Sequence, residues 1–409
     1  MKYIFQLDTL FATLFIFFVI VGIGSLPISF DAVDPVAEAL KDFESTDIVF
    51  NQLHDPAEIA VDENIVLINI GEANRATIAK QIDILNKYQP KVMAMDIRFI
   101  KDKTPDQDFP LMMAFSQVKN LVLGARMYDL DSVKDITWHS LETSNPKFTQ
   151  YGVNAYVNVH TGDANGGGFR TTRRFIPRAK MNDSTMLSFP AKIAQLFDST
   201  KFEKLMQRTN VEEIINWRGN IYPDDLMKSK FMVLDVEDVL NENFDGSIIK
   251  DKILLFGFMG RHLRDEFHID DKFYTPLNEQ LAGRAYPDMY GVVVHANVIS
   301  MILHEDYINY LPNFLNALIA FILCYLNVAL FLYIADKAKI YYDLITKIWQ
   351  LVESIALMTI VVILMSNYNL KIEFTFALIA ILLSGDLTEL YAGSIRDIFL
   401  KLLKKVGLT

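Results

Sequence analysis

The sequence contains almost no cysteine: Cys324 is the only one among 409 residues. It cannot form an internal disulfide. Because it lies in a hydrophobic run, it is best explained as a small apolar residue. The lack of disulfides does not argue against export, since a bacterial envelope permits disulfides but does not require them.

Basic charge is also scarce, with 39 Lys and Arg residues against 50 Asp and Glu, a formal net charge of −11. A nucleic-acid-binding surface would need a basic patch or stripe, so this class of partner is not expected. The chain has no G-x-S-x-G, H-E-x-x-H or Walker A motif, and no G-x-G-x-x-G after a strand. We therefore expect no enzyme activity and no cofactor.

Hydrophobic residues make up 51% of the chain and are concentrated in a few runs. The first, Thr9 to Phe30, contains no charged residue and is long enough to cross ~30 Å of hydrocarbon as a helix. A cleaved signal peptide is the competing interpretation. Its basic flank would be Lys2 alone, and the run exceeds the usual ~7–15-residue signal core. We therefore predict an uncleaved N-terminal anchor over residues 1–30.

Three more runs follow in residues 311–392, which we predict to be a region of three transmembrane helices. Leu311 to Ala335 carries no charge, and Ile348 to Tyr368 carries one acid, Glu353, near its start. The last run, Phe374 to Ala392, is interrupted by Asp386 and Glu389. It can still cross if these acids face the headgroups or the helix bundle.

Basic residues predict the orientation, because positively charged loops stay in the cytoplasm. The linker 336–347 and the tail 393–409 are both basic. Four spans place both on the cytoplasmic side, together with the N-terminus. Residues 31–310 then lie outside, in the periplasm or the extracellular space, and the protein sits in a bacterial inner membrane.

The exported region predicts an α/β domain with a mostly parallel sheet. Continuous apolar runs indicate buried strands, and Asn74–Tyr88 has the apolar spacing of a helix. Strands that alternate with helices imply right-handed parallel crossovers. The predicted strands are Ile65–Ile70, Val92–Asp96, Asn120–Arg126, Tyr151–His160, Glu213–Trp217 and Ile253–Phe258, and further helices are predicted at Phe109–Ser116 and Leu187–Phe197.

Several short motifs occur in a fixed order along residues 31–310. They are Asp96-Ile97-Arg98-Phe99, Arg174-Phe175-Ile176-Pro177, Asn216-Trp217-Arg218-Gly219, Thr275-Pro276 and the run from Gly291 to Asn297, GVVVHAN. In this order they resemble the CHASE2 extracellular sensor domain. One span before the domain and three after it also match that family.

The resemblance implies a sensor domain that binds a ligand or a partner outside the membrane. Two regions depart from the family pattern: Arg170-Thr171 stands where Asp–Gly is common, and the loop 259–288 is long and charged. CHASE2 sensors usually feed a fused kinase or cyclase domain. This chain has only a short basic tail after the last predicted span, so we expect a separate protein to provide the output.

Candidate ligand-binding residues come from the sheet edge and from the motifs. Asp96 ends a central strand, at the edge where open α/β sheets bind ligands, and Arg98 of the same motif is a second candidate ligand-binding residue. Helix capping, or a buried pair with Arg98 or Arg126, is the alternative role for Asp96. Arg173 and Arg174 belong to a cluster of arginines that could hold an anion.

The motif GVVVHAN adds His295 and Asn297 as candidates. A packed or hydrogen-bonded helix residue is the alternative for His295. The loop 259–288 contains a group of side chains of the kinds that bind metals: His262, Asp265, His268, Asp270 and Asp271. A long polar loop is usually just solvated, and we predict no metal site.

Glu353, Asp386 and Glu389 are candidates for contacts within the membrane. Pairing with Lys347 or Arg396 would explain them, and the alternatives are partner contacts or an ion path.

The leading hypothesis is a non-catalytic sensor subunit that signals through its spans to other membrane or cytoplasmic proteins. Its partners would then be the lipid bilayer and signalling proteins, with a homo-oligomer as one possibility. The alternative is a structural scaffold of an envelope complex. A transporter-like subunit would need polar residues at mid-membrane, where only Asn316 and Asn327 qualify.

Overall fold

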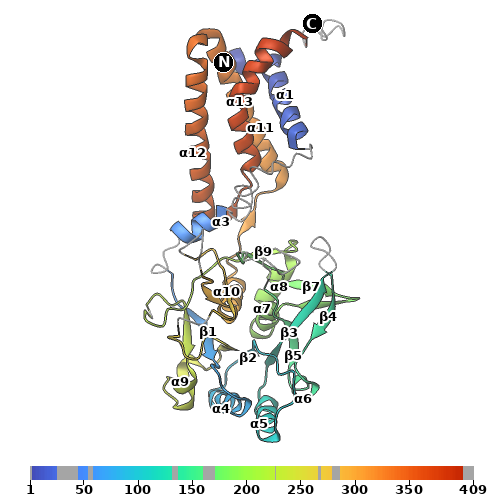
Figure 1. Ribbon diagram of the computed structural model, residues 1–409, viewed down its shortest axis with the longest axis vertical. Helices are drawn as coiled ribbons and strands as arrows, with labels where there is room; N and C mark the ends of the chain where they lie inside the picture. Colours follow the sequence, from blue (N-terminus) through green and yellow to red (C-terminus); the bar gives the residue numbers. More distant parts are fainter. Residues whose placement is uncertain are drawn as a thin grey trace. The chain divides into compact units, whose positions relative to one another are not determined.

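The computed structural model describes residues 2–24, 45–53, 59–130, 137–159, 171–225, 227–265, 269–278 and 286–398 (Figure 1). The chain divides into two compact units. One comprises residues 46–308, and the other comprises residues 1–45 together with 309–409. This division lies close to the predicted boundaries of the exported domain, 31–310.

Unit 46–308 is built on a nine-stranded sheet in the order β10-β1-β11-β2-β3-β4-β7-β8, with β5 paired to β3. The five strands from β10 to β3 are all parallel to one another. Four of them match predicted apolar runs, whereas β10 was not predicted. These strands are β1 (Asp62–Asn69), β2 (Val92–Met95), β3 (Leu121–Leu130), β10 (Phe231–Leu234) and β11 (Ile253–Gly257).

The remainder of the sheet mixes directions: β3 pairs antiparallel with β4, and β7 pairs antiparallel with β8. These strands are β4 (Thr137–Glu142), β5 (Val153–Tyr156), β7 (Arg178–Met181) and β8 (Ser184–Leu187). Two further pairs of two-residue strands join β6 (Arg174–Phe175) to β9 (Glu213–Ile214) and β12 (Lys272–Phe273) to β13 (Met289–Tyr290).

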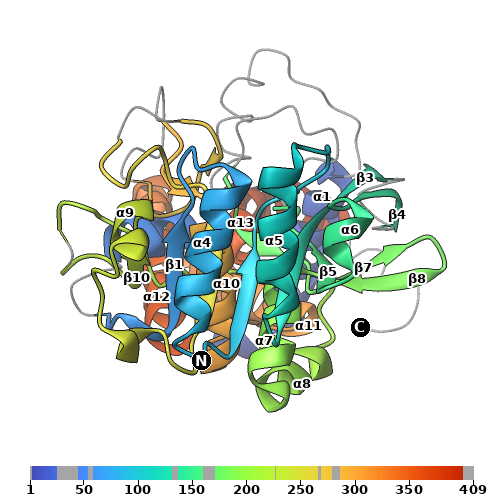
Figure 2. The same ribbon diagram turned by 90° about the horizontal axis from the view of Figure 1, so that it is seen from below.

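Helices cover both faces of the sheet. On one face α4 (Arg75–Asn86) and α5 (Pro105–Ser116) bury their apolar sides against β1, β2, β3 and β11 (Figure 2). On the other face, α10 (Gly291–His304) contacts β1 and β11, and α7 (Phe189–Phe197) contacts β2, β3 and β5. The shorter helices of this unit are α3 (Ser45–Ile48), α6 (Pro146–Thr149), α8 (Ser199–Gln207) and α9 (Val236–Leu240).

Local sequence explains where these helices begin and how deeply they lie. Asn74 caps α4, since its side chain accepts the backbone N–H of Thr77, and Ser188 caps α7 through the N–H of Ala191. Helix α10 is buried from Gly291 to Leu303. An apolar helix without a polar face has to pack on all sides, which fits its central position against the sheet.

The second unit is an α-helical bundle. In the described part of the chain, three helices are long and apolar enough to cross a bilayer: α11 (Asn313–Lys337), α12 (Tyr342–Tyr368, preceded by a short turn) and α13 (Thr375–Leu390, which continues to Ile398). They match the three predicted C-terminal spans. The N-terminal helix α1 (Leu7–Gly24) is apolar but shorter, and the end of the predicted anchor at Phe30 lies outside the described residues.

Helix α1 packs against α11 and α13, so it belongs to the same bundle. Arg396, just past α13, lies 2.8 Å from the carboxylate of Asp8, at the start of α1. The hydroxyl of Tyr391 donates to the same carboxylate at 3.1 Å. The beginning of α1 and the end of α13 therefore lie at the same end of the bundle.

Two predicted strands are shorter in the structure. The alternating run 151–160 forms only β5 within its described residues. Beyond β5, the side-chain amide of Asn158 takes the place of a backbone ladder, since it accepts the N–H of Met127 and donates to the carbonyl of Met127. The run 213–217 forms only the two-residue β9, and the segment after it is held by a side chain of α10 instead. The predicted glycine loop 162–168 and Arg170 lie outside the described residues.

Candidate functional site

Asp96 lies between the carboxyl end of β2 and the first turns of α10. Its backbone N–H donates to the carbonyl of Phe256 at 2.8 Å, which continues the parallel ladder by one residue. Its side chain is 14% exposed, and Oδ2 lies 3.9 Å from Nε2 of His295. A Cβ atom on Gly291 would lie 3.8 Å from the same oxygen, so the carboxyl group reaches the beginning of α10.

A second carboxyl group, that of Asp271, joins this site. Asp271 has a φ of 67°, and its carbonyl accepts the N–H of Gly291 at 3.0 Å. Burial raises the pKa of Asp271, and the charge of Asp96 raises it further. Burial also raises the pKa of Asp96 to about 7, against the opposing charge of Arg98. Each carboxyl group thus favours the neutral form of the other.

His295 completes the cluster from the second turn of α10. It is 5% exposed, and its ring packs edge-on against Phe189 of α7, with centroids 5.2 Å apart. Burial lowers the pKa of His295 to about 4. At neutral pH the imidazole is therefore uncharged, and its contact with Asp96 is not an ion pair.

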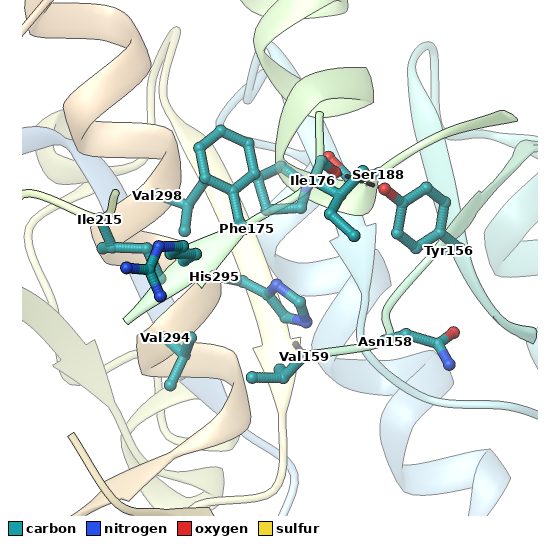
Figure 3. A pocket seen from close by; sticks show the side chains of 12 residues that line it. Tyr156, Asn158, Val159, Phe175, Ile176, Ser188, Ile215, Val294, His295 and Val298 are labelled. Atoms are coloured by element: carbon teal, nitrogen blue, oxygen red, sulfur yellow. Dashed lines mark hydrogen bonds between the residues drawn. The ribbon is translucent and has the colours of Figure 1, made fainter. Parts of the chain in front are cut away.

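A small hollow opens beside His295 (Figure 3). Its volume of about 20 Å³ has room for a water molecule. The hydroxyl of Tyr156 on its wall donates to the carbonyl of Ile176, so this polar group already has a partner. The lining residues are Tyr156, Asn158, Val159, Arg174, Phe175, Ile176, Ser188, Pro190, Ile215, Val294, His295 and Val298.

Two arginines supply positive charge near the carboxyl groups without bonding them. Arg98 pairs with Glu142 and donates to the hydroxyl of Tyr128 at 3.2 Å. The guanidinium of Arg126 lies 5.4 Å from the centre of the Tyr128 ring. The predicted direct pair of Asp96 with either arginine is therefore replaced by a longer-range interaction. Asp96 does not cap α5 either, because Thr104 occupies that position.

The two neighbouring candidate arginines take different places. Arg174 begins β6 and lines the hollow. Arg173 forms a two-pronged ion pair with Asp47 of α3, with Nε–Oδ1 and Nη2–Oδ2 distances of 2.9 and 2.7 Å. The structure thus places Arg174 with His295 at the hollow and directs Arg173 to the segment that follows the N-terminal helix.

Asn297 is a buried clamp. Its Oδ1 accepts the backbone N–H groups of Arg218 and Gly219 at 2.8 and 3.1 Å, and its Nδ2 donates to the carbonyls of Gly219 and Val293. All these bonds lie within the protein. They hold the Asn216–Gly219 motif against the GVVVHAN helix.

A serine, a histidine and an aspartate meet at the other end of α10, but they do not form a catalytic triad. Ser300 donates to Oδ2 of Asp62 at 2.5 Å, and Nε2 of His304 lies 3.1 Å from the same oxygen. A triad needs the imidazole between the hydroxyl and the carboxylate. Here both contact the carboxylate, so the cluster ties β1 to α10 and activates no nucleophile.

The candidate acids of the bundle have separate environments. Glu353 accepts the amide of Asn327 at 2.6 Å, and Trp349 donates to the same Asn327 at 3.0 Å. Asp386 pairs with Lys347 at 2.7 Å, as one alternative predicted. Glu389 is exposed. The predicted partner contacts of all three remain predictions.

Sequence reasoning missed Asp47 and the role of Asp271. Asp47 stands in a polar segment whose four-residue helix leaves no periodic signal. Asp271 was one of several acids in a long loop. Its backbone is in the left-handed conformation, and its carbonyl accepts the N–H of Gly291, neither of which the sequence indicates. Across the described residues, no three His, Cys, Asp or Glu side chains gather as a metal site would require, and His268 of the predicted loop lies outside them.

Comparison with known proteins gives one result. The family model of the CHASE2 domain matches residues 15–331, which include the whole of unit 46–308 and parts of the helical bundle on either side. Neither the curated proteins nor the solved structures include a match to the chain.

Proposed function

Because this chain belongs to the CHASE2 domain family, a family of sensor domains, we propose that it is a non-catalytic sensor subunit of a membrane signalling system. Its exported domain detects a signal, and its helices pass the change to separate proteins. The domain lies outside a bacterial inner membrane, with both chain ends in the cytoplasm. The basic linker 336–347 supports this orientation.

The observation that carries the proposal is the cluster of Asp96, Asp271 and His295 beside the hollow. Buried ionisable groups with shifted pKa values are frequent at functional sites, because function requires groups whose pKa matches their task. They stand at the carboxyl edge of a parallel sheet, where α/β domains bind their ligands. The cluster also touches α10, the last helix before the first C-terminal span.

Signalling through the bundle requires two arrangements of the helices that differ in their affinity for the signal. The bundle contains polar contacts suited to such a change. Glu353 and Asn327 join α12 to α11, and Lys347 and Asp386 join α12 to α13. Polar contacts in a bilayer are few and directional, so their loss or exchange defines distinct packings.

A structural scaffold of an envelope complex is the second candidate. The small volume of the hollow favours it, since about 20 Å³ does not admit a typical organic ligand. In that case the α/β domain would serve as a docking surface, and the cluster at Asp96 would be a consequence of packing.

Affinity purification from native membranes in mild detergent separates the two candidates. The tagged full chain is compared with membranes that lack the tag, and the co-purifying proteins and the particle size are determined. A sensor subunit is expected to bring down a kinase, a cyclase or another signalling protein. A large homo-oligomer, or a complex with structural envelope proteins alone, would contradict the proposal.

A further inference from the structure

The carboxyl group of Asp96 is largely buried, with its side chain 14% exposed. Within the described parts of the chain, Oδ2 lies 3.9 Å from Nε2 of His295, which is too long for a hydrogen bond. Partial burial without a close donor from the protein disfavours the carboxylate relative to the protonated group.

The charges around Asp96 come from each element that packs against it. Arg98 follows β2 and Arg126 stands on β3, and both are positive. Asp271 from the loop before β12 is an acid, and His295 on α10 is neutral at pH 7. Helix α7 presents the uncharged ring of Phe189. One acidic neighbour and two distant cations leave the protonation of Asp96 finely balanced.

We propose that Asp96, Asp271 and His295 form a proton-binding site through which the exported domain responds to the pH outside the membrane. Asp96 takes up the proton from solvent on its carboxylate and becomes a neutral acid. His295 stays neutral and Asp271 responds to the change of charge. This inference rests on the proposed sensory function for its purpose, but proton uptake by the domain can be measured without it.

The pKa of Asp96 suits this role. A value of about 7 means that the group is half protonated near neutral pH, with about a tenfold change in the ratio of its two forms for each pH unit. His295, with a pKa of about 4, stays unprotonated over the same range. Asp96 therefore changes its charge between about pH 6 and 8, whereas His295 does not.

Helix α10 is the element that registers the change. The carboxyl group of Asp96 lies beside Gly291, the first residue of α10, and the carbonyl of Asp271 accepts the N–H of Gly291 at 3.0 Å. An ionised Asp96 is attracted by the positive end of the helix and repels the carboxyl group of Asp271. Proton uptake removes both forces at once, so the contact between Asp271 and Gly291 differs between the two states.

Two measurements on the full chain in lipid nanodiscs test the proposal. Infrared difference spectra between pH 8 and pH 6 report carboxyl groups that become protonated, and hydrogen exchange reports the amides of residues 289–295. The wild-type chain is compared with Asp96→Asn, Arg98→Gln and Asp288→Asn. Asp288 is the matched control, because burial raises its pKa to about 6 but its carboxyl group is bonded to Thr275 instead.

The wild-type chain is expected to gain a protonated-carboxyl signal that includes a component with a midpoint near pH 7. The protection factors of the amides at the start of α10, which correct for the intrinsic effect of pH on exchange, should change several-fold. Asp96→Asn should abolish this component and the change in protection, leaving the signal of Asp288 near pH 6, whereas Asp288→Asn should preserve both effects. Arg98→Gln should move the midpoint to higher pH, since it removes the cation that favours ionised Asp96. This last variant keeps the test decisive if Asp96→Asn does not fold.

A titration that persists unchanged in Asp96→Asn, or a midpoint that Arg98→Gln does not move, would overturn the proton site. So would protection factors at the start of α10 that are equal at the two pH values. The proposed sensory function can fail separately. If the carboxyl group titrates but native membranes yield no signalling partner, the proton-binding site is supported and the proposed sensory function is contradicted.

Discussion

Arg173 and Asp47 form a buried ion pair across 126 positions of the chain, with side chains that are 10% and 2% exposed. Asp47 belongs to the segment that leads from the N-terminal helix into the domain. Arg173 immediately precedes Arg174 and Phe175, which line the hollow, and its carbonyl accepts the N–H of Ile215, which also lines it. The pair therefore connects α3, which carries Asp47, with the segment that forms one wall of the hollow.

Breaking this pair should destabilise the domain strongly. Asp47→Ala removes both prongs of the ion pair with the buried guanidinium of Arg173, so we expect the free energy of unfolding to fall by about 3–5 kcal/mol. Denaturant unfolding of the full chain in detergent, followed through the domain, measures the change. Asp224→Ala is the matched control, because Asp224 pairs with Arg264 at the surface and should cost less than about 1 kcal/mol. Equal losses would show that the buried pair is not special.

The clamp formed by Asn297 predicts a second large effect. Asn297→Leu keeps a similar size but removes the side-chain oxygen that accepts the N–H groups of Arg218 and Gly219. We expect the free energy of unfolding to fall by about 1–3 kcal/mol for each of these two groups. Thermal unfolding should show a lower midpoint. Trp217 can report it by fluorescence, because this side chain is buried and directly precedes Arg218 in the sequence. Asn86→Ala, which removes one exposed hydrogen bond, serves as control. If both variants unfold alike, Asn297 has another role.

The pKa shifts of Asp96 and His295 predict opposite effects of pH on stability. The folded chain binds a proton at Asp96 between about pH 4 and 7 where the unfolded chain does not, so this group stabilises the fold below pH 4 and loses that contribution as the pH rises through 7. His295 does the reverse: its contribution is present above pH 6.5 and is lost as the pH falls through about 4.

Two variants separate these contributions. Asp96→Asn keeps the histidine, so its stability should rise with pH between about 4 and 6.5. His295→Gln keeps the aspartate, so its stability should fall over the same range. Other groups titrate in both variants, so the quantity to follow is the free energy of unfolding of Asp96→Asn minus that of His295→Gln. This difference should increase as the pH rises from about 4 to 6.5. A constant difference would mean that neither group has a shifted pKa.

In the bundle, Glu353 should matter more than Glu389. Glu353→Leu removes the acceptor of the Asn327 amide, and interhelical hydrogen bonds in membranes contribute about 0.6–2 kcal/mol. Glu353→Gln keeps an acceptor and should be close to the wild type. Resistance of the bundle to unfolding in detergent is the measurement, with exposed Glu389→Gln as the control. Failure of Glu353→Gln alone would point to a need for the carboxyl group itself.

The sequence predicts the parallel core of the domain well, because strands such as β1 and β11 are buried on both faces and read as continuous apolar runs. Strands β4, β7 and β8 escape prediction for the opposite reason. Their residues are largely half-buried or exposed, and their pattern gives neither a continuous run nor a clean alternation. Tertiary pairing, rather than local preference, makes them strands.

The candidate site is predicted in part. Asp96 is singled out by its place at the end of an apolar strand, and the structure brings it to His295, a contact that the sequence did not predict. The pairing of Arg173 with Asp47 and the clamp of Asn297 on Gly219 join residues 126 and 78 positions apart. A single sequence carries no signal for such contacts, since neither spacing nor periodicity relates the partners.

The proposed function requires that a change at the exported site alters the arrangement of the helices in the membrane. Spin labels at Phe18 of α1 and Ile355 of α12, both exposed, can be placed in a Cys324→Ala background, and the distance between them measured in nanodiscs at pH 6 and pH 8. We predict that the distance distribution differs between the two pH values, and that Asp96→Asn removes the difference while Asp288→Asn retains it. Distributions that coincide at both pH values in the chain with Asp96 intact would contradict the account.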